Sequence, residues 1–128
     1  MDEQQQELLM KFQFFEQQMR MMQEQLSVIE RESAEMNSMK SDLDEVPKSV
    51  GVEFLAPMGK GIFAKSKMTD DELIVDIGNN LLVKRSVPET QKIIEVQVKK
   101  LEEIRGDLNK NLEEIHEEMG KLIQEAQS

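Results

Sequence analysis

Two stretches of the chain carry apolar residues at alternating steps of four and three positions, the 3.5-residue period of a coiled-coil helix. Nine of eleven such positions are apolar in the first seam, and ten of twelve in the second. The first seam is Leu8, Phe12, Phe15, Met19, Met22, Leu26, Ile29, Ser33, Met36, Lys40 and Leu43. The second seam is Val87, Gln91, Ile94, Val98, Leu101, Arg105, Leu108, Leu112, Ile115, Met119, Leu122 and Ala126. At a rise of about 1.5 Å per residue, the two seams correspond to helices of roughly 55 and 60 Å. Because these lengths match, we expect the second helix to run back along the first.

The ends of both helices are marked by particular residues. Residues 3–46 predict one helix without internal proline or glycine, and we expect Pro47 to end it, because the residue before a proline is disfavoured in the helical region. Ser86 and Glu89 have the spacing of a capping box, which predicts a helix start at residue 87. The chain therefore divides into residues 1–46, a coiled-coil helix, residues 47–86, an assembly region, and residues 87–128, a second coiled-coil helix.

Residues 47–86 change to a pattern of short strands and turns. We expect strands at residues 51–56, 62–67, 73–77 and 81–85. Gly59 and Gly61 are available for positive φ in the first turn, and residues 78–80 read as the second turn. The predicted fold class is α+β: a long antiparallel α-helical coiled-coil hairpin with two β-hairpins, four short strands in all, at its closed end.

A small sheet on a thin helical hairpin has unpaired edges and apolar faces that need a cover. Assembly of several subunits through these strands is the expected solution. The residues that we expect to mediate it are Val52, Phe54, Leu55, Pro57, Gly59, Gly61, Phe63, Leu73, Val75, Ile77, Leu82 and Val83.

The charge distribution narrows the class of partner. The net charge is −10, with −7 on residues 1–46, +1 on residues 47–88 and −4 on residues 89–128. Nucleic acid and anionic membrane surfaces are disfavoured, because both require clustered Lys and Arg. The chain has no Cys, no apolar run long enough to cross a membrane and an acidic, polar start unlike a secretory signal. We expect a soluble protein of the cytoplasm.

No constellation of residues points to catalysis, and we expect neither a cofactor nor a metal. Residues 57–61 lack P-loop spacing and precede a strand rather than a helix, which favours a plain turn. Asp70, Asp71 and Glu72 lack calcium-loop spacing, which favours a solvated turn. His116 has no second His or Cys to share a metal with and is expected at the surface.

A family resemblance is carried mainly by residues 54–65, with the sequence FLAPMGKGIFAK, and by residues 75–78 and 82–86 of the second hairpin. This stretch resembles the alpha-class subunit of prefoldin, and two hairpins rather than one also point to that class. The resemblance implies a heterohexamer of two alpha and four beta subunits with a double β-barrel platform and six coiled coils. It implies that the free ends of the coiled coils hold unfolded polypeptides and pass them to a group II chaperonin, without nucleotide or metal.

Apolar residues near the two chain ends are the candidates for client binding. They are Leu8, Leu9, Met10, Phe12, Phe14, Phe15, Met21, Leu122 and Ile123. Exposed apolar side chains and adaptable methionines suit the holding of unfolded chains. The alternative interpretation is that the off-seam members broaden a local core or pack against a neighbouring helix, and that the seam members are core.

Two other functions stay open at this point. A structural or adaptor coiled coil would use the β region only to oligomerise and would have no affinity for unfolded chains. A prefoldin-like subunit of a dedicated complex would have one stable partner and little client breadth.

Overall fold

The computed structural model describes residues 2–127 and consists of two long helices separated by two β-hairpins, which confirms the predicted fold class. In chain order the elements are α1 (Glu3–Asp42), η1 (Leu43–Glu45), η2 (Pro47–Ser49), β1 (Glu53–Gly59), β2 (Ile62–Lys67), β3 (Leu73–Asp76), β4 (Leu82–Arg85) and α2 (Val87–Gln127). The described residues form two compact units. One combines the residues up to Ala34 with those from Lys99 onward, and the other is Glu35–Val98.

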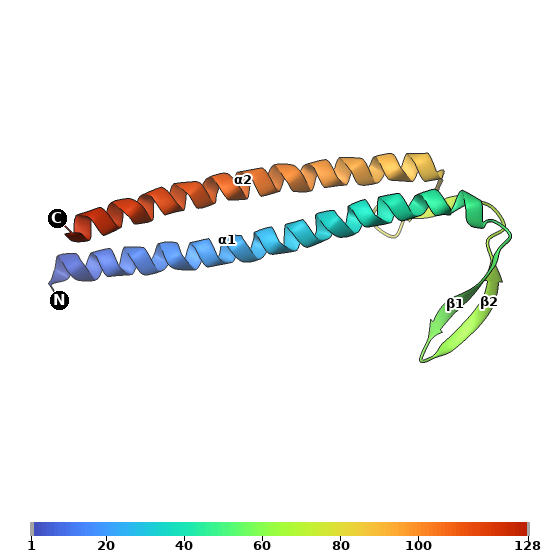
Figure 1. Ribbon diagram of the computed structural model, residues 1–128, viewed down its shortest axis with the longest axis horizontal. Helices are drawn as coiled ribbons and strands as arrows, with labels where there is room; N and C mark the ends of the chain where they lie inside the picture. The colour runs from blue at the N-terminus through green and yellow to red at the C-terminus, as the bar shows by residue number, and fades with distance from the viewer. Residues whose placement is uncertain (1, 128) are drawn as a thin grey trace. The chain divides into compact units, whose positions relative to one another are not determined.

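In the first unit, the opening turns of α1 lie beside the closing turns of α2, so the two helices are antiparallel (Figure 1). The seams predicted from the sequence are the faces that meet. Every residue of the first seam is half-buried, and Gln18 is the only other residue of α1 that is not exposed. In α2, Ile115, Met119 and Leu122 are buried. The 3.5-residue period therefore identifies the packed face of each helix correctly.

The second seam departs from the prediction at two positions. Arg105 and Ala126 are exposed. A long arginine side chain keeps its guanidinium in water even beside an apolar contact, and the alanine is too short to reach across to α1. Thr90, which lies off the seam, is buried instead, and its Oγ1 donates a hydrogen bond to the carbonyl of Ser86 at 2.8 Å.

The two helices share their interface unequally. No residue of α1 is buried, whereas six apolar residues of α2 are at most 9% exposed. Five of the eleven residues of the first seam are Phe or Met, and all five are half-buried, so part of each side chain stays in water. The aromatic seam residues Phe12 and Phe15 are therefore partly accessible in the paired helices.

In the second unit, α1 ends at Asp42, four residues earlier than predicted. An α-helix through Pro47 would require its missing N–H to bond to the carbonyl of Leu43, and its ring would clash there. The chain instead tightens into the 3₁₀ turns η1 and η2, with hydrogen bonds Val46 N to Leu43 O and Ser49 N to Val46 O, each 3.1 Å. Val46 keeps helical backbone angles. The prediction that the residue before Pro47 leaves the helical region was therefore wrong.

Strand β1 also differs from its prediction, because it runs on through Pro57 to Gly59 and begins only at Glu53. It pairs with β2 in an antiparallel register in which Phe54 faces Ser66 and Ala56 faces Ala64, with an irregularity between Pro57 and Gly59. Proline is tolerated because a two-stranded sheet has only edge strands. Lys60 and Gly61 have φ of 53° and 78°, as a two-residue type I′ turn requires.

The second hairpin pairs β3 with β4, with Val75 opposite Val83 and Leu73 opposite Arg85. Its turn uses Asn79 and Asn80, both with positive φ, and is closed by a hydrogen bond from Leu81 N to Gly78 O at 2.9 Å. The strands end at Asp76 and begin at Leu82, one residue inside each predicted bound. The four strands form two separate two-stranded sheets, not one four-stranded sheet.

Helix α2 begins as predicted. Ser86 Oγ accepts a hydrogen bond from the Glu89 N–H at 3.2 Å, which satisfies one of the free donors of the first turn. The Glu89 carboxylate lies 3.8 Å from Arg85 Nε, so it pairs with a cation of β4. Both Gly106 and Gly120 continue the helix without a break.

Candidate functional site

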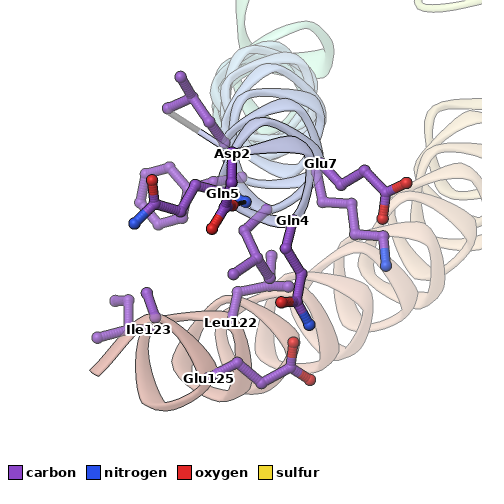
Figure 2. Close-up of a pocket in the computed structure, with 12 residues that line it drawn as sticks. Asp2, Gln4, Gln5, Glu7, Leu122, Ile123 and Glu125 are labelled. Atoms are coloured by element: carbon purple, nitrogen blue, oxygen red, sulfur yellow. Dashed lines mark hydrogen bonds between the residues drawn. The ribbon is translucent and has the colours of Figure 1, made fainter. Parts of the chain in front are cut away.

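A groove of about 850 Å³ lies in the first unit between the first turns of α1 and the last turns of α2. We call it the tip groove. Its apolar lining comes from Leu8, Leu9 and Phe12 of α1 and from Leu122, Ile123 and Ala126 of α2. Figure 2 shows Leu122 and Ile123 carried by α2, with Gln4 and Glu125 extending toward each other from the two helices. Five of the nine predicted client-binding residues therefore line one groove.

These five residues differ in accessibility. Leu9 and Ile123 are 43% and 47% exposed, Leu8 and Phe12 are half-buried, and Leu122 is 9% exposed. Leu122 therefore supports the floor of the groove, and the other four present apolar surface to whatever enters it. A groove with an apolar floor that is open in the free protein is suited to bind an extended apolar segment.

Met10, Phe14 and Met21 lie on the face of α1 opposite its seam. With Val28 they form one line along the helix, which we call the outer stripe. Their spacings of four and seven residues are close to whole helical turns, so the four side chains fall within about 40° of one another. They are between 45% and 69% exposed. Val28 was missed in the sequence analysis, although its seven-residue spacing from Met21 was a signal for it.

One aromatic residue of the outer stripe contacts one aromatic residue of the first seam. The rings of Phe14 and Phe15 are in edge-to-face contact, with centroids 5.8 Å apart and an angle of 60° between planes. Phe15 is half-buried in the seam, whereas Phe14 is 56% exposed. Offset and edge-to-face aromatic pairs are favourable beyond their buried area, so Phe15 restrains the exposed ring.

The predicted assembly residues form a second accessible apolar surface, on the hairpins. Among them Val52, Phe54, Leu55, Phe63, Ile77 and Leu82 are between 46% and 63% exposed. Leu73, Val75 and Val83 are half-buried on one face of the second hairpin. Pro57, Gly59 and Gly61 shape the first hairpin and its turn. Four apolar residues that the sequence analysis left out of this group, Met58, Ile62, Ile74 and Leu81, are also exposed.

The polar candidates have ordinary structural surroundings. Asp70 Oδ1 accepts a hydrogen bond from the Glu72 N–H at 2.9 Å, which is a local turn contact. His116 is exposed on α2. Within residues 2–127 no three His, Cys, Asp or Glu side chains lie together in a way that would hold a metal ion. In this part of the chain, neither α1 nor α2 contains an apolar stretch that could span a bilayer.

Comparisons with known proteins agree on one family. Residues 15–128 match the family described as prefoldin subunit. The prefoldin subunit alpha of Methanobrevibacter smithii is 29% identical over 122 residues, covering 94% of this chain and 84% of that protein. Prefoldin subunit alpha 2 of Thermococcus kodakarensis is 32% identical over 81 residues, covering 62% of this chain and 57% of that protein.

A solved structure shares the fold. The cryo-EM structure of filamentous PFD from Methanocaldococcus jannaschii has a TM-score of 0.79 and 21% identity, and the match covers 90% of this chain and 97% of that one. The family match extends over most of the chain, and the similar curated proteins are prefoldin alpha subunits. The chain therefore belongs to the prefoldin subunit family, in its alpha class.

Proposed function

We propose that this chain is a subunit of an ATP-independent co-chaperone, which captures unfolded proteins at the paired ends of α1 and α2 and delivers them to a group II chaperonin. Membership of the prefoldin family implies a co-chaperone role and assembly with other prefoldin subunits. The proposed assembly is a cytoplasmic heterohexamer of two alpha and four beta subunits. Prefoldin is a family of chaperones and not of enzymes.

The observation that carries this proposal is the accessible apolar surface of the first unit. Leu9 and Ile123 in the tip groove, and Phe14 and Met21 on the outer stripe, are each at least 43% exposed. Large exposed apolar side chains gathered in one region are typical of binding surfaces. Methionine adds adaptability, since a flexible and polarisable thioether fits partners of different shapes.

The hairpins support the assembly part of the proposal. Each is an isolated two-stranded sheet, and such a sheet is at best marginally stable in water. Each hairpin has two unpaired edges and exposed apolar residues such as Phe54, Phe63 and Leu82. Pairing with strands of neighbouring subunits satisfies the edges and covers the apolar faces. Several tip grooves would then be held together, and their weak contacts would add up on one client.

The test uses the assembled complex and two matched variants of this chain. Leu9→Ser/Ile123→Ser removes exposed apolar surface from the first unit, at one residue on each helix. Met39→Ser/Val96→Ser removes surface of similar exposure from the second unit, again at one residue on each helix. Suppression of aggregation of a chemically unfolded client is measured by light scattering. We expect the first variant to lose most of its suppression, with hexamer mass unchanged, and the second to retain it.

Equal suppression by both variants and the wild type would contradict client capture at this surface. A wild-type complex that never suppresses aggregation would favour a structural coiled coil, and suppression limited to a single protein would favour a dedicated complex. Delivery is tested separately by adding a group II chaperonin and ATP to the loaded complex. Appearance of folded client only in the presence of the chaperonin is the expected result.

A further inference from the structure

The rim of the tip groove is charged, and carboxylates outnumber cations among the described residues that line it. Among the described residues, three carboxylates line it, those of Asp2 and Glu7 on the α1 side and Glu125 on α2, together with one cation, Lys11. All four side chains are exposed. Figure 2 shows Asp2 and Glu7 at the start of α1 and Glu125 on α2, the helix that also carries Leu122 and Ile123. The site therefore combines an apolar floor with a negative rim.

This combination has a direct consequence for what binds. A ligand that places its own carboxylates at the rim meets like charges, whereas one that places Lys or Arg there meets opposite charges. Complementary charges around an apolar contact raise the association rate and reject wrong partners, even where they add little to the apolar affinity. The long stems of Lys and Arg also cover apolar surface while their charged heads stay in water.

We propose that the tip groove selects client segments in which a short apolar run is flanked by Lys or Arg. The apolar residues lie on Leu8, Leu9, Phe12 and Ile123, and the flanking cations lie against Glu7 and Glu125. This inference rests on the proposed function, because it names the class of segment that the same groove takes. It goes beyond apolar capture in predicting that acidic unfolded segments of equal hydrophobicity bind less tightly.

The probes are three short, unstructured, fluorescently labelled peptides with one shared apolar core. One is flanked by lysines, one by glutamates and one by serines. Binding to the assembled complex is measured by fluorescence anisotropy at low and high salt. At low salt we expect the lysine-flanked peptide to bind about tenfold tighter than the glutamate-flanked one. At about 1 M salt, where the Debye length is near 3 Å, the ratio should approach one.

Matched variants assign the preference to the groove. Glu7→Gln/Glu125→Gln removes two rim carboxylates and should reduce the preference at least about threefold. Glu16→Gln/Glu117→Gln makes the same change in net charge at exposed positions outside the groove lining, again one on each helix, and should leave the preference intact. Asp2 is left in place because its Oδ1 accepts a hydrogen bond from the Gln5 N–H at 2.8 Å and caps α1.

The outcomes separate this inference from the proposed function. Equal affinity for all three peptides, or an equal loss of preference in both double variants, would overturn the inference while client capture stood. Failure of every peptide to bind, together with failure to suppress aggregation, would overturn the proposed function and the inference with it.

Discussion

The side-chain amide of Gln91 donates a hydrogen bond to the main-chain carbonyl of Lys40, with Nε2 and O 3.0 Å apart. The same nitrogen lies 2.7 Å from Asp44 Oδ1. The last four carbonyls of a helix have no partner within that helix, so Gln91 satisfies one of them from α2. Lys40 in turn places Nζ 2.7 Å from Glu95 Oε1. Two polar positions of the seams therefore link the helices within the second unit.

The first prediction concerns this link. Gln91→Ala leaves the Lys40 carbonyl without its donor, and we expect it to lower the free energy of local opening at the end of α1 by about 1–2 kcal/mol. Amide hydrogen exchange of residues 36–46 in the assembled complex measures the effect. Gln97→Ala, an exposed glutamine on the same helix, is the control and should change exchange little. Equal exchange rates in both variants would show that the hydrogen bond from Gln91 to the Lys40 carbonyl does not stabilise the end of α1.

The second prediction tests the start of α2. Ser86→Ala removes the oxygen that accepts the Glu89 N–H and should cost about 1 kcal/mol of stability. Ser86→Asp retains a capping oxygen and should recover most of the loss. Chemical unfolding of the complex, followed by circular dichroism, gives the comparison. If Ser86→Asp and Ser86→Ala lower stability equally, Ser86 does not stabilise the protein through its capping hydrogen bond.

The third prediction concerns the turn of the first hairpin. Lys60 adopts φ of 53°, a conformation that is costly for most side chains by about 1–2 kcal/mol and that asparagine tolerates better. Lys60→Asn should therefore stabilise the hairpin by about 0.5 kcal/mol. Gly61→Ala should destabilise it by about 1 kcal/mol, through backbone conformation alone, because a Cβ there meets no atom within 4 Å. Hydrogen exchange of β1 and β2 amides measures both, and a shift in the same direction for the two variants would refute the turn assignment.

The periodicity of the seams identified the helices and their packed faces correctly, because every turn of each helix must present an apolar residue to the other helix. It failed where a single residue decided the outcome. The end of α1 at Asp42 follows from the missing N–H of Pro47, a requirement that acts four residues upstream. The extension of β1 through Pro57 depends on that strand lying at an edge, and no local pattern shows which strands pair.

For the candidate site, composition was enough to find the apolar residues but not their arrangement. Whether Leu9 and Ile123 share one groove depends on the register of α1 against α2, which only the packed structure supplies. The same holds for Glu7 and Glu125, whose charges have meaning for binding only because they lie on one rim. Val28 is different, since its seven-residue spacing from Met21 was visible in the sequence and the prediction still missed it.

The fourth prediction concerns methionine oxidation. Met10 and Met21 are 69% and 56% exposed, whereas Met119 is 9% exposed. Peroxide transfers one oxygen to the thioether, giving a sulfoxide and water, and should modify the exposed methionines, Met10 and Met21 among them, before Met119. A polar sulfoxide on the outer stripe should reduce client holding several-fold. Met10→Leu/Met21→Leu keeps apolar surface without the sulfur, so it should resist this loss; mass spectrometry locates the added oxygen. Equal loss in the variant would place the sensitive residues elsewhere.

The fifth prediction concerns the glycines of α2. Gly106 and Gly120 are helical, and a Cβ at either position meets no atom within 4 Å. Alanine at each should stabilise the helix by about 0.8–1 kcal/mol. Chemical unfolding of the complex measures the gain. Client holding is measured in parallel, and a loss caused by Gly120→Ala alone would mean that bending of α2 near the tip groove contributes to capture.

The unpaired edges of the two hairpins also bear on how the protein must be made. Each newly synthesised chain carries two separate two-stranded sheets, and both edges of each sheet are open. Copies that outnumber their partner subunits would find such edges only on one another, and this kind of pairing has no built-in stopping point. Balanced production of the subunits, or rapid removal of surplus chains, is therefore a requirement set by the strand topology itself.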